Sequence, residues 1–246
     1  MLNHTLGVFV SHLNNHVALD AADQAALLSL PHTVRTCKTM DYIVREGSVP
    51  NPCAILLSGF AIRQKIEAEG ARQIVGIQIP GDALDMQHLF LDCADHNVQA
   101  LGNVEIANIP RAALQQIAMA RPTIAHAFAV NNQIEASIAR EWLLNIGRRD
   151  ARRRMAHLLC EVAVRLERQH LAAEYHYELP MTQEQLADTL GLTAVHVNRT
   201  LKGLETEGLI TRAGRAVRIV RPLELQDVAG FSANYLHLKQ QKAAAQ

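Results

Sequence analysis

The chain has 246 residues, of which 49% are apolar and 20% charged, a composition that excludes a disordered or fibrous protein. No run approaches 18 apolar residues, the N-terminus lacks the features of a signal peptide, and the four cysteines form no C-x-x-C pair. These features predict a cytoplasmic protein with reduced thiols and no membrane span. Residues 148–221 hold 13 basic against 9 acidic residues, although the whole chain balances at 24 each, so this region is expected to meet a polyanion.

Residues 1–120 predict short helices followed by a β domain. Amphipathic helical patterns fill the first 30 residues, and one of them ends at Pro31. From Thr33 to Pro110, short β-rich runs such as AILLSGFAIRQKI and RQIVGIQIPGD alternate with turn residues, including Ser58-Gly59 and Pro80-Gly81-Asp82. This spacing is typical of an all-β sandwich or barrel.

A long helix is predicted over residues 121–148, with Pro122 in its first turn. One side of it carries a mainly apolar stripe about 120° wide, made of Ile124, Phe128, Asn131, Ile134, Ile138 and Trp142. We interpret part of the stripe as a dimer seam that pairs with the same helix of a second subunit, with Asn131 fixing the register. The alternative is that the stripe packs only on its own β domain.

The C-terminal region begins at a break over residues 147–150, and residues 151–170 predict another helix. Its apolar side is expected to face inward, through Met155, Leu158, Leu159, Val162 and Leu166. The basic run RRDARRR at its start either contacts phosphates or forms the solvated face of a linker helix, and we favour the second interpretation.

Residues 182–206 predict two short helices joined by a tight corner. Thr182 and Gln185 have capping-box spacing at the start of the first helix, and Gly191 can adopt the left-handed conformation that ends it. Thr193 then caps the second helix. A corner this short between two helices is typical of a helix-turn-helix.

The second of these helices has two different faces. Val197, Leu201 and Leu204 are spaced to face inward. The opposite face mixes a branched apolar side chain, a guanidinium and an ammonium, as contacts to bases and phosphates require; its members are Val195, Arg199, Lys202 and Thr206, flanked by His196 and Asn198.

After Gly208, the segment LITRAGRAVRIVRP predicts two strands around a turn, with Arg212, Arg215 and Arg218 on or near it. A helix-turn-helix followed by a basic hairpin is a winged helix, here within residues 149–222, and residues 223–246 are expected to form a C-terminal helix and a frayed tail. The alternative is a three-helix packing unit without DNA contacts. The expected class is α+β.

These residues resemble the Crp/Fnr family of bacterial transcription regulators. The resemblance covers residues 30–222 in order, and LPMTQEQLADTLGLTAVHVNRTLKGLETEGLI is its most specific part. It implies an N-terminal cyclic-nucleotide-binding-like β-roll (a double-stranded jelly roll), a long dimerisation helix and a C-terminal winged helix-turn-helix. A homodimer would then place two recognition helices in successive major grooves of a near-palindromic operator, with RNA polymerase as a further partner.

The resemblance also implies site residues. Base contacts would come from Ala194, Val195 and Arg199, and a phosphate contact from Lys202. Ala194 and Val195 depart from the side chains that other members carry, so a different operator sequence is expected. The predicted DNA-binding residues are Thr182, Thr193, Ala194, Val195, His196, Asn198, Arg199, Lys202 and Arg215.

The family's effector pocket would align with Asp85, Met86, His88, His96 and Asn97. Met86 and His96 stand where cyclic-nucleotide-binding members carry the carboxylate and the arginine that hold the ligand. An N-terminal cysteine cluster for an iron–sulfur centre is also lacking. The resemblance therefore implies an unknown small-molecule effector other than cyclic AMP, and no cofactor.

Two further hypotheses remain open. His88, Cys93 and His96 could ligate a metal or haem, but their spacing matches no standard site, and we favour a polar loop. The protein could also be an effector-sensing or partner-binding module whose winged helix no longer reads DNA. Enzyme function is not expected, because the sequence has no Gly-rich phosphate loop, nucleophile elbow or catalytic metal motif.

Overall fold

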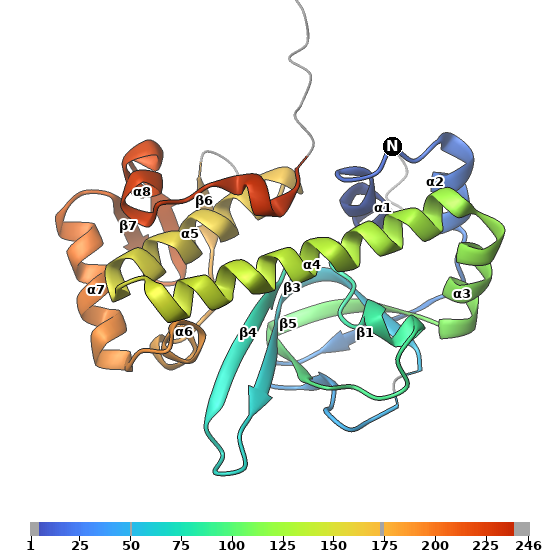
Figure 1. Ribbon diagram of the computed structural model, residues 1–246, viewed down its shortest axis with the longest axis horizontal. Helices are drawn as coiled ribbons and strands as arrows, with labels where there is room; N and C mark the ends of the chain where they lie inside the picture. Colours follow the sequence, from blue (N-terminus) through green and yellow to red (C-terminus); the bar gives the residue numbers. More distant parts are fainter. Residues whose placement is uncertain (1–4, 50, 173–174, 239–246) are drawn as a thin grey trace, which may run out of the picture.

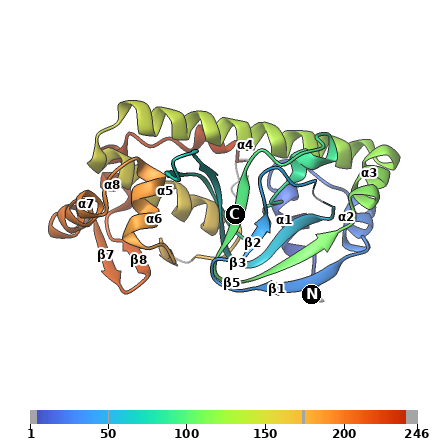
Figure 2. The same cartoon turned by 90° about the horizontal axis from the view of Figure 1, so that it is seen from below.

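A computed structural model describes residues 5–49, 51–172 and 175–238. The long helix α4 (Pro122–Arg148) runs along the whole molecule, with a β-rich part beside its first half and a mainly helical part beside its second (Figure 1). Seen from below, α4 lies along one side of both parts (Figure 2). The end of the predicted frayed tail, residues 239–246, lies outside the described residues.

The β-rich part is an antiparallel sheet in the order β1-β5-β3-β4, with β2 also paired to β5. Its elements are α1 (Gly7–Asn14), α2 (Ala21–Leu28), β1 (Thr33–Cys37), β2 (Tyr42–Val44), β3 (Cys53–Ile66), β4 (Arg72–Gln78), the 3-10 helix η1 (Met86–Leu89), β5 (Asn97–Ile109) and α3 (Arg111–Ala120). The long strands β3 and β5 each begin with a run of consecutive buried residues, so both of their faces are covered there. This confirms the predicted β domain with preceding helices.

One predicted turn is wrong. Ser58-Gly59 lies inside β3, where the pairing with β5 shifts register on both sides of Ser58. Gly59 has a φ of 80°, and a Cβ atom there would lie 2.7 Å from the carbonyl oxygen of Asn103. A turn residue in a strand thus marks a bulge, because only glycine tolerates both this φ and this close approach.

The helical part contains three helices and a three-stranded sheet in the order β6-β8-β7, followed by a C-terminal segment. Its elements are α5 (Ala151–Arg168), β6 (His176–Glu178), α6 (Gln183–Leu190), α7 (Ala194–Thr206), β7 (Ile210–Ala213), β8 (Ala216–Ile219), α8 (Pro222–Ala229) and the 3-10 helix η2 (Ala233–Leu236). All five residues predicted to face inward on α5 are buried. The α+β class, the long helix and the winged helix-turn-helix are therefore confirmed.

The predicted dimer seam is wrong as assigned. Five of its residues are at most 7% exposed within the single chain, namely Ile124, Phe128, Asn131, Ile134 and Trp142. The sixth, Ile138, is half-buried against the core of the helical part. The stripe packs on the chain's own β domain, α1 and α5. Its large apolar side chains are therefore buried without a second subunit.

The two parts are also joined directly at the β3–β4 hairpin. Arg72 Nε donates to Asp188 Oδ2 of α6 at 2.8 Å, and Gln73 Nε2 donates to the Asp188 carbonyl oxygen at 2.6 Å. The helix-turn-helix therefore rests on the sheet of its own chain. Among the described residues, no helix combines the length and apolarity that crossing a membrane requires.

Candidate nucleic-acid interface and effector region

The corner between α6 and α7 is built by local hydrogen bonds. The backbone N–H of Gln185 donates to Thr182 Oγ1 at 3.1 Å, and the Thr182 N–H donates to Gln185 Oε1 at 2.9 Å. Gly191 ends α6 with a φ of 62°, and the His196 N–H donates to Thr193 Oγ1 at 3.3 Å to cap α7. The predicted capping box, stop and second cap are all confirmed, and together they fix the angle at which α7 leaves the domain.

Helix α7 has the predicted inner and outer faces. Val197, Leu201 and Leu204 are at most 3% exposed and pack against α5 and the β6-β8-β7 sheet. On the outer face Val195 is 79% exposed, and Arg199 and Lys202 also lie in solvent. Because these three side chains lie in solvent, this face is available to contact another molecule.

Two groups of cations in this domain differ in whether they form ion pairs within the chain. Arg152, Arg212 and Arg221 form ion pairs with Glu207, Glu205 and Glu224 respectively. The second group is Arg199 and Lys202 on α7, with Arg215 and Arg218 at the β7–β8 hairpin, and none of these four has a hydrogen bond or ion pair from its side chain to any described residue. Charges that the protein leaves unpaired in solvent are suited to an anionic partner.

The hairpin matches the predicted wing. Gly214 turns it with a φ of 61°, and Arg215 is exposed beside that turn. Sequence patterns missed the third strand of this sheet, β6, which pairs with β8 and anchors to α5 where Tyr177 Oη donates to the Leu159 carbonyl oxygen at 2.9 Å. Three residues are too short for a periodic signal, and only the alternating HYE pattern hints at the strand.

The nine predicted DNA-binding residues lie at the N-termini of α6 and α7, along α7 and on the wing. Thr182 and Thr193 use their hydroxyl groups as caps, so they position the helix starts. Ala194, His196 and Asn198 lie on α7 beside the outer face. The structure thus brings the set together on one domain, and DNA contact by each residue remains a prediction.

The basic run at the start of α5 has a structural role that neither sequence interpretation included. Arg154 donates to the carbonyl oxygens of Leu190 at 2.8 Å and of Arg149 at 2.8 Å. The first of these bonds satisfies the C-terminal end of α6, which has no basic residue of its own in the last turn. Arg149 in turn binds Glu141 at 2.6 Å. These arginines hold the helix-turn-helix to the long helix.

The predicted effector-pocket residues do not form an open pocket. Asp85, Met86, His88, His96 and Asn97 are all at most 9% exposed. Met86 belongs to the apolar core, Asp85 Oδ1 accepts from the Ala54 N–H at 3.1 Å, and Asn97 Oδ1 accepts from the Glu46 N–H at 3.1 Å. These five side chains are therefore buried inside the β domain, and contact of an effector with them stays a prediction.

The His88, Cys93 and His96 constellation does not converge. The two imidazole rings stack with centroids 6.4 Å apart, whereas Cys93 is exposed and its thiol donates to the Ala94 carbonyl oxygen at 3.7 Å. Burial and the nearby Arg63 lower the pKa of His96. In the part of the chain that the structure describes, no three side chains are arranged to hold a metal ion.

Two family profiles match separate parts of the chain: the cyclic nucleotide-binding domain over residues 34–121 and the Crp-like helix-turn-helix domain over residues 153–228. The chain is 31% identical over 186 residues to the transcriptional activatory protein AadR of Rhodopseudomonas palustris, covering 75% of this chain and 76% of that one. This chain belongs to the Crp/Fnr family of transcription regulators. It is also 30% identical over 216 residues to the nitrogen fixation regulation protein FixK of Bradyrhizobium diazoefficiens, covering 86% and 88%.

Solved structures agree on the Crp/Fnr fold. FixK2 from Bradyrhizobium japonicum superposes with a TM-score of 0.76 at 24% identity, covering 83% of this chain and 100% of that one. A CRP family transcriptional regulator from Thermus thermophilus superposes with a TM-score of 0.65 at 18% identity, covering 80% and 97%. The predicted resemblance is confirmed, and the protein is a Crp/Fnr-type transcription regulator with a helix-turn-helix.

In this Crp/Fnr regulator a buried polar network joins the β domain to the DNA-binding part. Arg165 of α5 binds Asp82 at 2.8 Å and approaches Glu161 at 3.6 Å. Glu161 is fully buried and accepts from Trp142 Nε1 at 3.0 Å and from Tyr235 Oη at 2.7 Å. Burial raises the pKa of Glu161, and the Arg165 guanidinium offsets part of that rise. The network connects the sheet, α4, α5 and the C-terminal segment.

Proposed function

We propose that this Crp/Fnr regulator acts in the cytoplasm as a homodimer that binds a near-palindromic operator in double-stranded DNA. The single observation that carries the proposal is the outer face of α7, where Arg199 and Lys202 are exposed and have no partner within the described residues. Arg199 has the planar fork that matches guanine O6 and N7, and Lys202 is a point charge suited to phosphate. Two such helices in a dimer read half-sites about 34 Å apart.

Replacing Arg199 with alanine and replacing Lys202 with alanine should have different effects on DNA binding. Arg199→Ala should weaken operator binding by about 1–3 kcal/mol and relax the preference at one base pair per half-site. Lys202→Ala should weaken operator and random DNA alike and reduce the salt slope by about one unit per contact. The measurement is a binding series with operator and random duplexes over several salt concentrations.

Arg152→Ala is the matched control, because Arg152 is exposed and already paired with Glu207. It should leave the ratio of operator to random binding unchanged. An unchanged ratio for folded Arg199→Ala would show that α7 does not read sequence as proposed. Equal binding of operator and random duplexes by the original protein would favour the alternative module whose winged helix no longer reads DNA.

The homodimer is proposed through the other side of α4. A second set of small and apolar residues recurs there with alternating spacings of three and four, at Ala125, Ala129, Asn132, Ala136, Ala139 and Leu143. Each of them is exposed or half-buried, and Leu143 is 73% exposed. We call this set the outer stripe. Small side chains at these spacings let two helices approach closely, and Asn132 within the stripe would fix their register.

Ala136→Glu should convert the dimer to a monomer, because it places a charge at the centre of the outer stripe, where the partner helix would exclude water. Analytical ultracentrifugation measures the change in mass. Gln133→Glu introduces the same side chain on the exposed side of the same helix but off the stripe, and it should remain dimeric. A dimeric Ala136→Glu protein would show that the outer stripe is not the interface.

An effector other than cyclic AMP or an iron–sulfur cluster is also proposed. Support comes from the identities of Met86 and His96, because these positions offer neither a carboxylate for a ribose nor an arginine for a cyclic phosphate. RNA polymerase is proposed as a further partner, on the analogy of AadR, which is described as a transcriptional activatory protein.

A further inference from the structure

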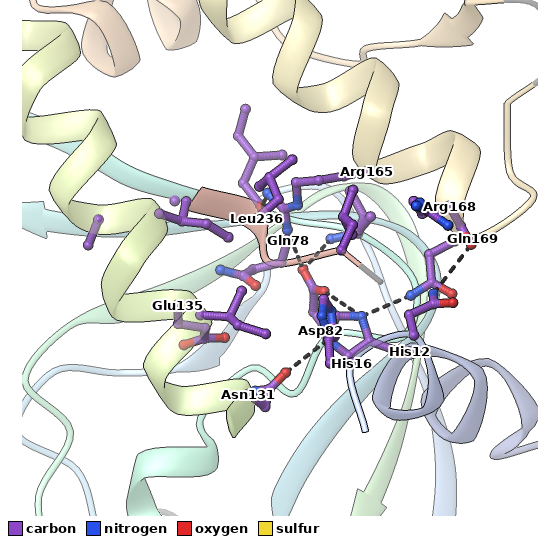
Figure 3. A pocket seen from close by; sticks show the side chains of 18 of the residues that line it. His12, His16, Gln78, Asp82, Asn131, Glu135, Arg165, Arg168, Gln169 and Leu236 are labelled. Carbon is purple, nitrogen blue, oxygen red and sulfur yellow. Dashed lines mark hydrogen bonds and ion pairs between the residues drawn. The ribbon is translucent and has the colours of Figure 1, made fainter. Parts of the chain in front are cut away.

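A cavity of about 80 Å³ lies between the β domain and the DNA-binding part (Figure 3). Its walls come from α1, β4, α4, α5 and the C-terminal segment, and it contains none of the five residues that the family resemblance assigned to an effector pocket. Ile77, Ile134, Ile138 and Leu236 supply an apolar side. The volume is larger than one water molecule needs and fits a molecule of a few non-hydrogen atoms.

A hydrogen-bond relay crosses the cavity and ends in unpaired groups. Gln169 Nε2 contacts His12 Nδ1 at 2.8 Å, and His12 Nε2 contacts Asn131 Oδ1 at 2.9 Å (Figure 3). The relay therefore runs from the C-cap residue of α5 through α1 to α4. Asn131 Nδ2 and Gln169 Oε1 are buried and have no partner among the described residues. If the relay runs in the opposite direction, it again leaves one donor at one end and one acceptor at the other.

Two ion pairs line the cavity, with Arg63 held 3.1 Å from Glu135 and Arg165 held 2.8 Å from Asp82. Arg63 Nε is a further buried donor without a partner in the described part of the chain. Buried donors and acceptors that lack partners are costly, so a ligand that satisfies them gains affinity.

We infer that this cavity binds a short-chain hydroxycarboxylate. A carboxylate accepts from the Arg63 and Asn131 donors, a hydroxyl group donates to Gln169, and a short carbon chain lies on the isoleucines. Bound there, the ligand touches both α4 and α5, so it biases how the DNA-binding part sits against the β domain. That last step rests on the proposed function, whereas binding itself does not.

The test is isothermal titration of the full-length protein without DNA, with lactate as the probe. Lactate should bind saturably, whereas propionate, which lacks the hydroxyl group, and lactamide, which lacks the charge, should each bind at least about tenfold more weakly. The absence of saturable heat from lactate, or equal affinities for all three compounds, would overturn the inference. Operator binding is measured separately on the same preparation, so loss of DNA binding does not affect this result.

Variants locate the site. Asn131→Asp keeps the shape of the side chain but replaces the donor with a negative oxygen, and it should weaken lactate binding at least about tenfold. Gln133→Glu adds the same charge on the exposed side of α4 and should bind lactate like the original protein. Ile138→Trp fills the cavity without removing a polar group and should also prevent binding. Unchanged lactate affinity in folded Asn131→Asp and Ile138→Trp proteins would place the ligand elsewhere.

Discussion

Arg165→Met should lower the free energy of unfolding by about 3–5 kcal/mol, the range observed when one member of a buried ion pair is removed. The side chains of Asp82 and Glu161 are at most 5% exposed, and Arg165 lies 2.8 Å from the first and 3.6 Å from the second. Methionine fills much of the same space but leaves both carboxylates buried without their cation. Equilibrium unfolding in urea, followed by circular dichroism, measures the change.

Arg152→Met is the matched control, because the Arg152 and Glu207 side chains are 46% and 43% exposed. Water screens this pair, so its loss should cost less than about 1 kcal/mol. A result of that size for Arg165→Met as well would show that the buried network adds little to the stability of the joint between the two parts.

Acidification should destabilise the protein through His157. This imidazole is 1% exposed, packs against Phe231 and Tyr235, and lies 3.2 Å from Glu141. Burial and the nearby Arg149 lower the pKa of His157 to about 4, although Glu141 acts in the opposite direction. A histidine in the unfolded chain has a pKa of about 6.5. Between about pH 6.5 and pH 4 this histidine therefore binds a proton in the unfolded chain but not in the folded chain.

The sign follows from that difference in proton binding. The stabilising effect of a neutral His157 is fully present above about pH 6.5 and is lost as the pH falls toward 4, with a total of about 3 kcal/mol at most. His157→Gln should flatten this part of the pH profile in urea unfolding experiments at about pH 7, 6 and 5. Replacement of the exposed His126 by glutamine should leave the profile unchanged. Identical profiles for the original protein and His157→Gln would assign the acid sensitivity to other groups.

The helix-turn-helix could be predicted almost residue by residue because local chemistry specifies it. The Thr182 capping box, the left-handed Gly191 and the Thr193 cap are separated by at most 11 residues, and each acts on backbone groups nearby. The inward spacing of Val197 and Leu201 follows from the period of a single helix. The wing strands followed from alternation around Gly214 for the same reason.

The use of each side of α4 could not be predicted, because both sides carry residues at helical spacing. The larger apolar stripe that includes Phe128 and Trp142 is equally consistent with an interface or with a core. Folding buried it within one chain and left the smaller outer stripe exposed. The period of a sequence shows which residues share a face, but it does not show what covers that face.

The cavity and the buried network depend entirely on tertiary structure. His12 is separated by 119 residues from Asn131 and by 157 residues from Gln169, and no local pattern connects them. Arg165 and Asp82 are separated by 83 residues. Backbone caps and helical periods act over a few residues and are visible in the sequence, whereas contacts between distant side chains exist only after the sheet, α4 and α5 have packed together.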